Sequence, residues 1–206
     1  MEKLKSSITN MALVLTGVAV ITGGILAFVN NITSGPIALQ KEKTLADGIK
    51  AVMGGGELSV AKTDTVRQND DKGKEMTYII YQTQDSQKKD LGAAVESTTQ
   101  GFGGDLKILV GFDPEGNILG YTLLEHAETP GLGAKADQWF QKGAKGNIIG
   151  KNPKEKLVVT KDGGQVDAIT ASTITSRAFL LAVNNAYKAY KATPVDGLSG
   201  ATEQNK

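Results

Sequence analysis

An uncharged apolar segment near the N-terminus, MALVLTGVAVITGGILAFV, most constrains what this chain can fold into. It runs from Met11 to Val29 without a charged residue, and a helix of that length is about what is needed to cross the hydrocarbon layer of a membrane. Its Gly and Thr residues are compatible with lipid because a helix satisfies its own backbone hydrogen bonds. The sequence therefore predicts a transmembrane helix at residues 10–30, after a short N-terminal segment at residues 1–9.

The flanking charges predict how this helix is oriented. Lys3 and Lys5 precede it, so the positive-inside rule keeps the N-terminus in the cytoplasm and places the remainder of the chain on the extracytoplasmic side of the inner (plasma) membrane. A cleaved signal peptide is the alternative. It is disfavoured because the apolar run exceeds a usual signal core and lacks a clear small-x-small cleavage site.

The composition excludes several kinds of functional site. The chain has no Cys and one His, His126, which excludes disulfides, iron–sulfur clusters, a Cys nucleophile and multi-His metal sites. The formal net charge is +1, and no basic run is interleaved with aromatic residues, so no nucleic-acid partner is expected. If the protein takes part in redox chemistry, the electrons must therefore reside on a bound organic cofactor.

The residues after the apolar segment have the pattern of an α+β domain, which we expect at residues 31–193. Helical spacing of apolar residues predicts helices at 36–52, 134–143 and 176–192. Runs of β-forming residues predict strands at 76–83, 92–100, 105–113, 117–126 and 156–160, with a hairpin at PEGN. We expect residues 57–75 to be loop with at most one strand, and residues 194–206 to be a flexible tail.

A stretch rich in hydroxyl residues, DAITASTITS, runs from Asp167 to Ser176, directly before the last predicted helix. One interpretation is an N-cap, because hydroxyl side chains satisfy the free N–H groups of a first helical turn. The other is a phosphate site, because the same N–H groups and the helix dipole attract anions. Five hydroxyls in seven positions exceed what one cap needs, and both interpretations stay open on physical grounds.

This stretch, the earlier HAETPGLG (His126 to Gly133) and the N-terminal anchor together resemble the G subunit of the Rnf ion-translocating electron-transport complex. That protein is related to the C subunit of the sodium-pumping NADH:quinone reductase, and both carry an FMN-binding domain. The resemblance covers nearly the whole chain. It implies an N-terminal transmembrane helix followed by an antiparallel-sheet FMN-binding domain with flanking helices.

In that family FMN is joined through its phosphate to a Thr hydroxyl within a pattern like D-g-x-[S/T]-g-A-T. Placed on this sequence from Asp167, the pattern implies that Thr173 carries the flavin. Two positions depart from it, because Ala171 stands where Gly is usual and Ser172 stands where Ala is usual. Both replacements are small.

A second copy of the pattern, DGLSGAT, lies in the tail and matches more literally, with Thr202 at the position of the modified Thr. No helix of useful length follows it, and Glu203 stands beside the Thr, where it would repel a phosphate. We therefore expect Thr173 to be the working site, and modification of Thr202 stays open.

The resemblance also implies which residues surround the flavin. A Gly-rich segment, Gln100 to Gly104, is the candidate second wall of the cleft, whereas the local pattern TPGLG alone indicates only a turn. Asp167 either serves recognition by the modifying enzyme or caps the turn. We expect His126 to be a solvated strand end and Trp139 to be a core residue. The expected cofactor neighbours besides Thr173 are Thr170, Ser172, Thr175, Asp167, Glu128, Thr129, Gly131, Leu132 and Gly133.

The function implied by the resemblance is electron relay through covalently bound FMN. The complex would move electrons between reduced ferredoxin and NAD and couple this transfer to sodium or proton transport. Expected partners are the other subunits, a flavin transferase and membrane lipid. Two alternatives are the equivalent subunit of a sodium-pumping NADH:quinone reductase and a membrane-anchored binding or assembly module without flavin.

Overall fold

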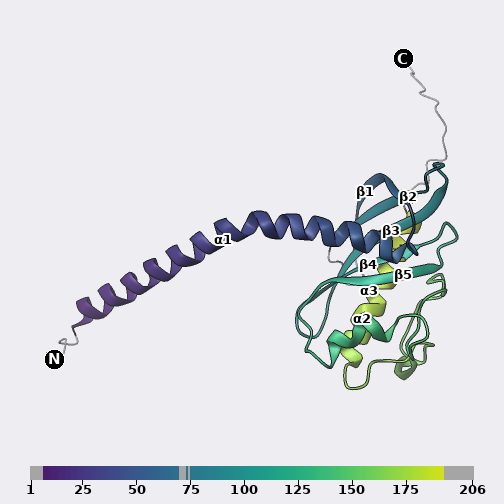
Figure 1. Cartoon of the computed structure of the whole chain (residues 1–206). Helices are drawn as coiled ribbons and strands as arrows, with labels where there is room; N and C mark the ends of the chain where they lie inside the picture. Colours follow the sequence, from purple (N-terminus) through teal and green to yellow (C-terminus); the bar gives the residue numbers. More distant parts are fainter. Residues whose placement is uncertain (1–6, 70–72, 74, 193–206) are drawn as a thin grey trace, which may run out of the picture. The chain divides into compact units, whose positions relative to one another are not determined.

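The computed structural model describes residues 7–69, 73 and 75–192 (Figure 1). A long N-terminal helix is followed by five strands and a C-terminal helix, which confirms the expected α+β class. The tail copy of the Thr motif, with Thr202, lies outside the described residues. The elements are α1 (Ile8–Val52), β1 (Ser59–Asn69), β2 (Glu75–Gln84), β3 (Asp90–Gln100), β4 (Asp105–Phe112), β5 (Ile118–His126), η1 (Gly133–Lys135), α2 (Ala136–Trp139), η2 (Thr160–Asp162) and α3 (Thr173–Ala192).

Helix α1 is continuous, although the sequence predicted separate helices at 10–30 and 36–52. The residues between them are weak helix formers rather than helix breakers, and the Thr33 hydroxyl donates to a carbonyl one turn earlier. Pro36 lies inside the helix, where it removes one backbone hydrogen bond without ending it.

The first part of α1 has no protein packed around it. Its most apolar stretch has a mean hydropathy of 2.4 and is 0% buried. Within the described part of the chain, α1 is the one helix long and apolar enough to cross a membrane, by length and composition. Its apolar side chains, such as Leu15 and Phe28, are exposed, as expected for a surface that contacts lipid.

The five strands form one antiparallel sheet in sequence order, β1-β2-β3-β4-β5. The predicted β4–β5 hairpin is confirmed. Residues 57–75 contain a full edge strand, β1, where we expected mainly loop. Its side chains are mostly exposed on both faces, so it shows no apolar alternation, and its backbone pairing with β2 defines it instead.

Helix α3 covers one face of the sheet (Figure 1). Alternate residues of the central strands face it, because successive side chains of a strand point to opposite faces. Phe179 of α3 stacks on Phe140 with ring centroids 4.3 Å apart and meets Tyr121 edge-on at 4.8 Å. Buried sheet residues of this core include Ile80, Leu106, Ile108, Val110, Phe112 and Ile118.

The last turns of α1, from Ala46 onward, belong to the same compact unit as the sheet. Ile49 and Val52 are buried there. Gly111 of β4 and Gly120 of β5 lie directly against the backbone of Val52, so a Cβ at either position would collide with it. These two glycines let the helix backbone approach the sheet closely.

The helix predicted at 134–143 is shorter than expected, and the strand predicted at 156–160 is not part of the sheet. Residues 134–143 form only η1 and α2, because the Trp139 and Phe140 carbonyls accept hydrogen bonds from the N–H groups of Gly146 and Ile148 rather than continuing a helix. Residues 156–160 form no strand of the sheet. The Val158 carbonyl accepts from residues 165 and 166 of its own loop, which leaves one isolated parallel bridge.

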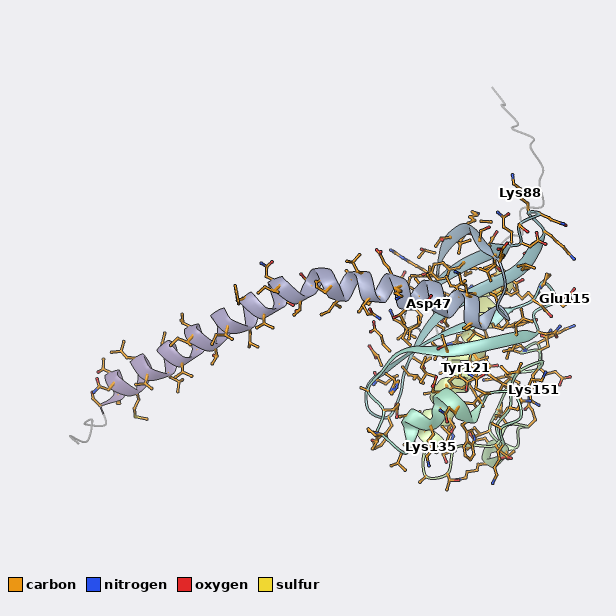
Figure 2. All side chains as sticks on the ribbon, in the orientation of Figure 1. Asp47, Lys88, Glu115, Tyr121, Lys135 and Lys151 are labelled. Carbon is orange, nitrogen blue, oxygen red and sulfur yellow. The ribbon has the colours of Figure 1, made fainter. Side chains whose placement is uncertain are left out.

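Tyr121 connects β5 to α2 through its hydroxyl group. The hydroxyl donates to the Ala136 carbonyl at 2.6 Å and accepts from the Phe140 N–H at 3.1 Å. Burial raises the pKa of Tyr121, so it stays a neutral donor. In Figure 2 its side chain lies inside the domain, whereas Lys88, Glu115 and Lys151 project from the outside.

Tyr121→Phe should lower the free energy of unfolding by about 1–2 kcal/mol, because it leaves the buried Phe140 N–H without its acceptor. Urea unfolding followed by circular dichroism measures the loss. Tyr187→Phe is the matched control, since it keeps the edge-on contact of that ring with Phe112. Equal stabilities of the two variants would contradict the structural role of the Tyr121 hydroxyl.

Candidate functional site

A cavity of about 360 Å³ opens where three segments that are distant in sequence meet. The loop after β3 contributes Phe102, and the N-terminus of α3 contributes residues 171–175. The segment after β5 contributes Glu128, Thr129, Leu132 and Gly133. The volume falls within the range of about 300–1,000 Å³ that is typical of small-molecule sites.

A buried carboxylate, that of Glu128, joins these three segments. Glu128 is 5% exposed, and its Oε1 accepts from the Phe102 N–H at 2.7 Å and from the Gly103 N–H at 3.4 Å. Its Oε2 accepts from the Thr175 hydroxyl at 2.7 Å. Hydrogen bonds to an ionised acceptor are stronger than neutral ones, so Glu128 fixes the walls of the cavity relative to one another.

Gly133 completes this contact from the side of the β5 segment. A Cβ at Gly133 would lie 2.7 Å from the Thr175 hydroxyl and closer still to the Glu128 carboxylate. Only a residue without a side chain fits beside that hydrogen bond. Gly131 has a different role, because it is an exposed turn residue with φ of 76° and does not line the cavity.

The hydroxyl residues of the Thr motif divide into structural and accessible ones. The Ser176 hydroxyl accepts from the Ile169 N–H and donates to the Ser172 carbonyl, both at 2.9 Å, which closes the loop before α3. The Thr175 hydroxyl already donates a hydrogen bond to Glu128. Thr173 is half-buried, stands in the first turn of α3 and lines the cavity.

Ala171 adopts a left-handed backbone conformation, with φ of 61°. Gly adopts this region freely, whereas a residue with a Cβ is destabilised there by roughly 1–2 kcal/mol. Ala171 lies two residues before Thr173. Its conformation reverses the direction of the chain between the exposed Thr170 and the buried Ser172. It gives a physical reason for Gly at this position of the motif and shows that Ala is tolerated at a cost.

The surroundings of Thr173 fit flavin mononucleotide. The first N–H groups of α3 have no partner within the helix and attract a phosphate, and Lys161 Nζ donates to the Thr173 hydroxyl oxygen at 3.1 Å. Three apolar side chains line the same cavity and are 67%, 42% and 54% exposed: Phe102, Leu132 and Ile174. They offer a surface for a flat apolar ring.

Of the residues expected near the cofactor, the structure brings most but not all to this cavity. Those that line it are Glu128, Thr129, Leu132, Gly133, Ser172, Thr173 and Thr175. Gly131, Asp167 and Thr170 do not. The Asp167 carboxylate accepts from the Thr160 hydroxyl at 3.3 Å, and its carbonyl accepts from the Trp139 indole at 2.8 Å.

Sequence reasoning missed Ile174 and Lys161. Ile174 lies inside the motif as an apolar residue among hydroxyls, which was a usable signal. Lys161 lies in a polar stretch twelve residues before Thr173, and no spacing rule connects the two. Only the folding of η2 back toward α3 brings them together.

Glu128→Ala should reduce the free energy of unfolding by about 2–3 kcal/mol, because it leaves the buried Thr175 hydroxyl and the N–H groups of Phe102 and Gly103 without their acceptor. Amide hydrogen exchange should rise most at Phe102 and Gly103. Glu115→Ala, at an exposed position, is the control for loss of a carboxylate. Unchanged exchange in the loop after β3 would contradict the locking role of Glu128.

Ala171→Gly should raise the stability by about 0.5–1 kcal/mol, because relief of left-handed strain exceeds the entropy that Gly adds to the unfolded chain. Thermal unfolding measures the change. Ala168→Gly is the control, since Ala168 is not among the described residues with positive φ, and it should be destabilising. Stabilisation by both substitutions, or by neither, would refute the strain at Ala171.

Family models match the chain in two regions. The model of the RnfG N-terminal region matches residues 1–52. The model of an FMN-binding domain matches residues 101–188, which include every residue that lines the cavity.

Curated relatives match most of the chain. The G subunit of the ion-translocating oxidoreductase complex of Vibrio cholerae serotype O1 (strain M66-2) is 31% identical over 187 residues, which cover 88% of this chain and 89% of the relative. The corresponding protein of Yersinia pestis is 34% identical over 171 residues, covering 79% and 80%.

Among solved structures, the crystal structure of Shewanella oneidensis NqrC matches with 21% identity and a TM-score of 0.44. The match covers 62% of this chain and 70% of that one. The extent and identity of the curated relatives decide the assignment: the chain belongs to the RnfG family, the G subunits of ion-translocating oxidoreductase complexes.

Proposed function

We propose that this protein is a membrane-anchored flavoprotein that relays electrons through FMN bound in the cavity and esterified through its phosphate to the Thr173 hydroxyl. The observation that carries the proposal is the position of Thr173. Its hydroxyl lies at the N-terminus of α3, on the cavity and beside a lysine. The Thr175 hydroxyl, which lines the same cavity, is instead bonded to Glu128.

The residues of the cavity have distinct tasks in this proposal. The first turn of α3 and Lys161 hold the phosphate, and Phe102, Leu132 and Ile174 contact the ring. Glu128 keeps the two ring-facing segments at a fixed separation from α3. When bound, FMN supplies the reversible uptake and release of electrons, while the protein sets its position and environment.

The covalent bond has a physical purpose in the membrane topology that we propose. Lys3 and Lys5 keep the N-terminus in the cytoplasm, so the domain lies on the outer side of the inner membrane, where a lost cofactor is not readily replaced. A flavin transferase attaches the FMN. The other subunits of the complex exchange electrons with it, and the complex couples electron transfer between ferredoxin and NAD to ion transport.

Thr173→Ala should abolish flavin attachment at the working site. Protein purified from its native membrane should carry one FMN residue, added with loss of one water, on the peptide that contains Thr173. Intact mass and peptide mapping measure this addition. Thr170→Ala, which removes an exposed hydroxyl of the same motif outside the cavity, should leave it intact.

A modification found only on the Thr202 peptide would overturn the assignment of Thr173. Absence of flavin from every peptide, in a host with an active flavin transferase, would refute the relay and favour a flavin-free binding or assembly module.

A further inference from the structure

We propose that Lys161 is the positioning residue for flavin attachment, holding the incoming phosphate at Thr173 and stabilising the Thr173 oxygen as it becomes the nucleophile. This inference rests on the proposed attachment at Thr173 and adds a residue outside the sequence motif. Lys161 Nζ lies 3.1 Å from Thr173 Oγ1 and donates a hydrogen bond to it.

The charge of Lys161 is available for a phosphate. Lys161 is not a member of the ion pairs Lys62–Asp64, Lys107–Glu96 or Arg177–Asp162. Two acidic residues close to it in the sequence are engaged elsewhere. Asp162 binds Arg177, and Asp167 accepts from the Thr160 hydroxyl. Lys161 therefore places one positive charge beside Thr173, where a phosphodiester would carry one negative charge.

A neighbouring ion pair positions Lys161. Arg177 Nε and Nη2 donate to the two carboxylate oxygens of Asp162, each at 2.7 Å, which is the bidentate geometry that guanidinium favours. The hydrogen bond from Arg177 lowers the pKa of Asp162, so the pair stays ionised at neutral pH.

This pair connects the two elements that carry the reacting groups. Arg177 lies one turn after Thr173 on α3, so the two side chains share a helix face. Asp162 is the neighbour of Lys161 in η2. The Asp162–Arg177 pair therefore holds η2 against the first turn of α3 and sets the reach of Lys161 to Thr173.

The attachment step balances with a flavin dinucleotide as donor. The Oγ1–P bond forms to the FMN phosphorus, the P–O bond to the adenylate half breaks, and adenylate leaves. The Thr173 proton passes to a base of the transferase. Lys161 already donates to Oγ1, so its charge opposes the negative charge that develops on that oxygen and on the phosphate. No electron changes hands in this step.

The test measures the rate at which the full-length, flavin-free protein in detergent is labelled by a flavin transferase and flavin adenine dinucleotide. In-gel flavin fluorescence and quantification of the Thr173 peptide follow the reaction. Lys161→Gln should be labelled about fivefold more slowly, the factor expected for loss of one exposed charge contact. Lys161→Arg, which keeps the charge, should recover most of the rate.

Three further comparisons separate the effect of the position of Lys161 from the effect of its charge. Lys142→Gln removes an exposed lysine outside the cavity and should label at the wild-type rate. Arg177→Gln should slow labelling although the charge of Lys161 is still present, because η2 loses the Asp162–Arg177 contact that sets its position against α3. Added salt should lower the labelling rate of the wild-type protein more than that of Lys161→Gln, because salt screens the charge of Lys161 and the variant lacks that charge.

The outcomes distinguish this inference from the proposed function. Normal labelling of Thr173 in Lys161→Gln, with the same salt dependence as wild type, would refute the role of Lys161 and leave attachment at Thr173 standing. Equal slowing in Lys161→Gln and Lys161→Arg would refute a role for the charge. A wild-type protein that is not labelled at Thr173 would refute the attachment itself.

Discussion

The Glu128 carboxylate holds together the part of the molecule on which the cavity depends. The loop after β3 and the first turn of α3 lie 25 to 47 residues from Glu128 along the chain, and both donate to this one side chain. A buried carboxylate is costly unless its oxygens are bonded. Because losing any of these hydrogen bonds would leave the buried carboxylate unsatisfied, its three partners are hard to rearrange.

The sheet and α3 supply the rigid support for that arrangement. Phe140, Phe179 and Tyr121 pack ring to ring where β5, α2 and α3 meet. The Thr99 hydroxyl donates to the Ala178 carbonyl at 3.0 Å and so links β3 to α3. The first turn of α3 thereby keeps a fixed place relative to β3. The groups that face the cavity are drawn from the ends of these elements, where backbone N–H groups and loop side chains are free to bind a ligand.

Sequence alone predicted the elements whose signals are local. The β4–β5 hairpin and helix α3 follow from alternation, turn residues and helical spacing. For residues 57–75 we expected loop with at most one strand, and the length of β1 could not be predicted because its stability comes from pairing with β2 and its side chains are exposed. The residues 156–160 have strand composition, yet the Leu157 N–H and carbonyl bond to the Asn184 side chain, which diverts them to α3.

The candidate site likewise has residues that the sequence predicted and features that it did not. The family pattern pointed to Thr173 and to the segment from Glu128 to Gly133, because those residues are contiguous in the sequence. The left-handed conformation of Ala171 and the contact between Lys161 and Thr173 depend on backbone angles and on η2. The contact of Lys161 leaves no periodic or compositional trace, and Ala171 does not signal a left-handed conformation as Gly would, so both are visible only in the folded structure.

The order in which the segments around the cavity occur along the chain also affects when the cavity forms during synthesis and folding. The loop after β3 and the segment after β5 are made first, and α3, which carries Thr173 and the Thr175 hydroxyl that donates to Glu128, is made last of the three. Contacts between residues so far apart form late in folding because the intervening chain must be ordered first. In the proposed attachment, Thr173 would therefore reach its final geometry only after the domain is complete. Attachment that depends on this geometry would follow folding and would report that the domain has matured.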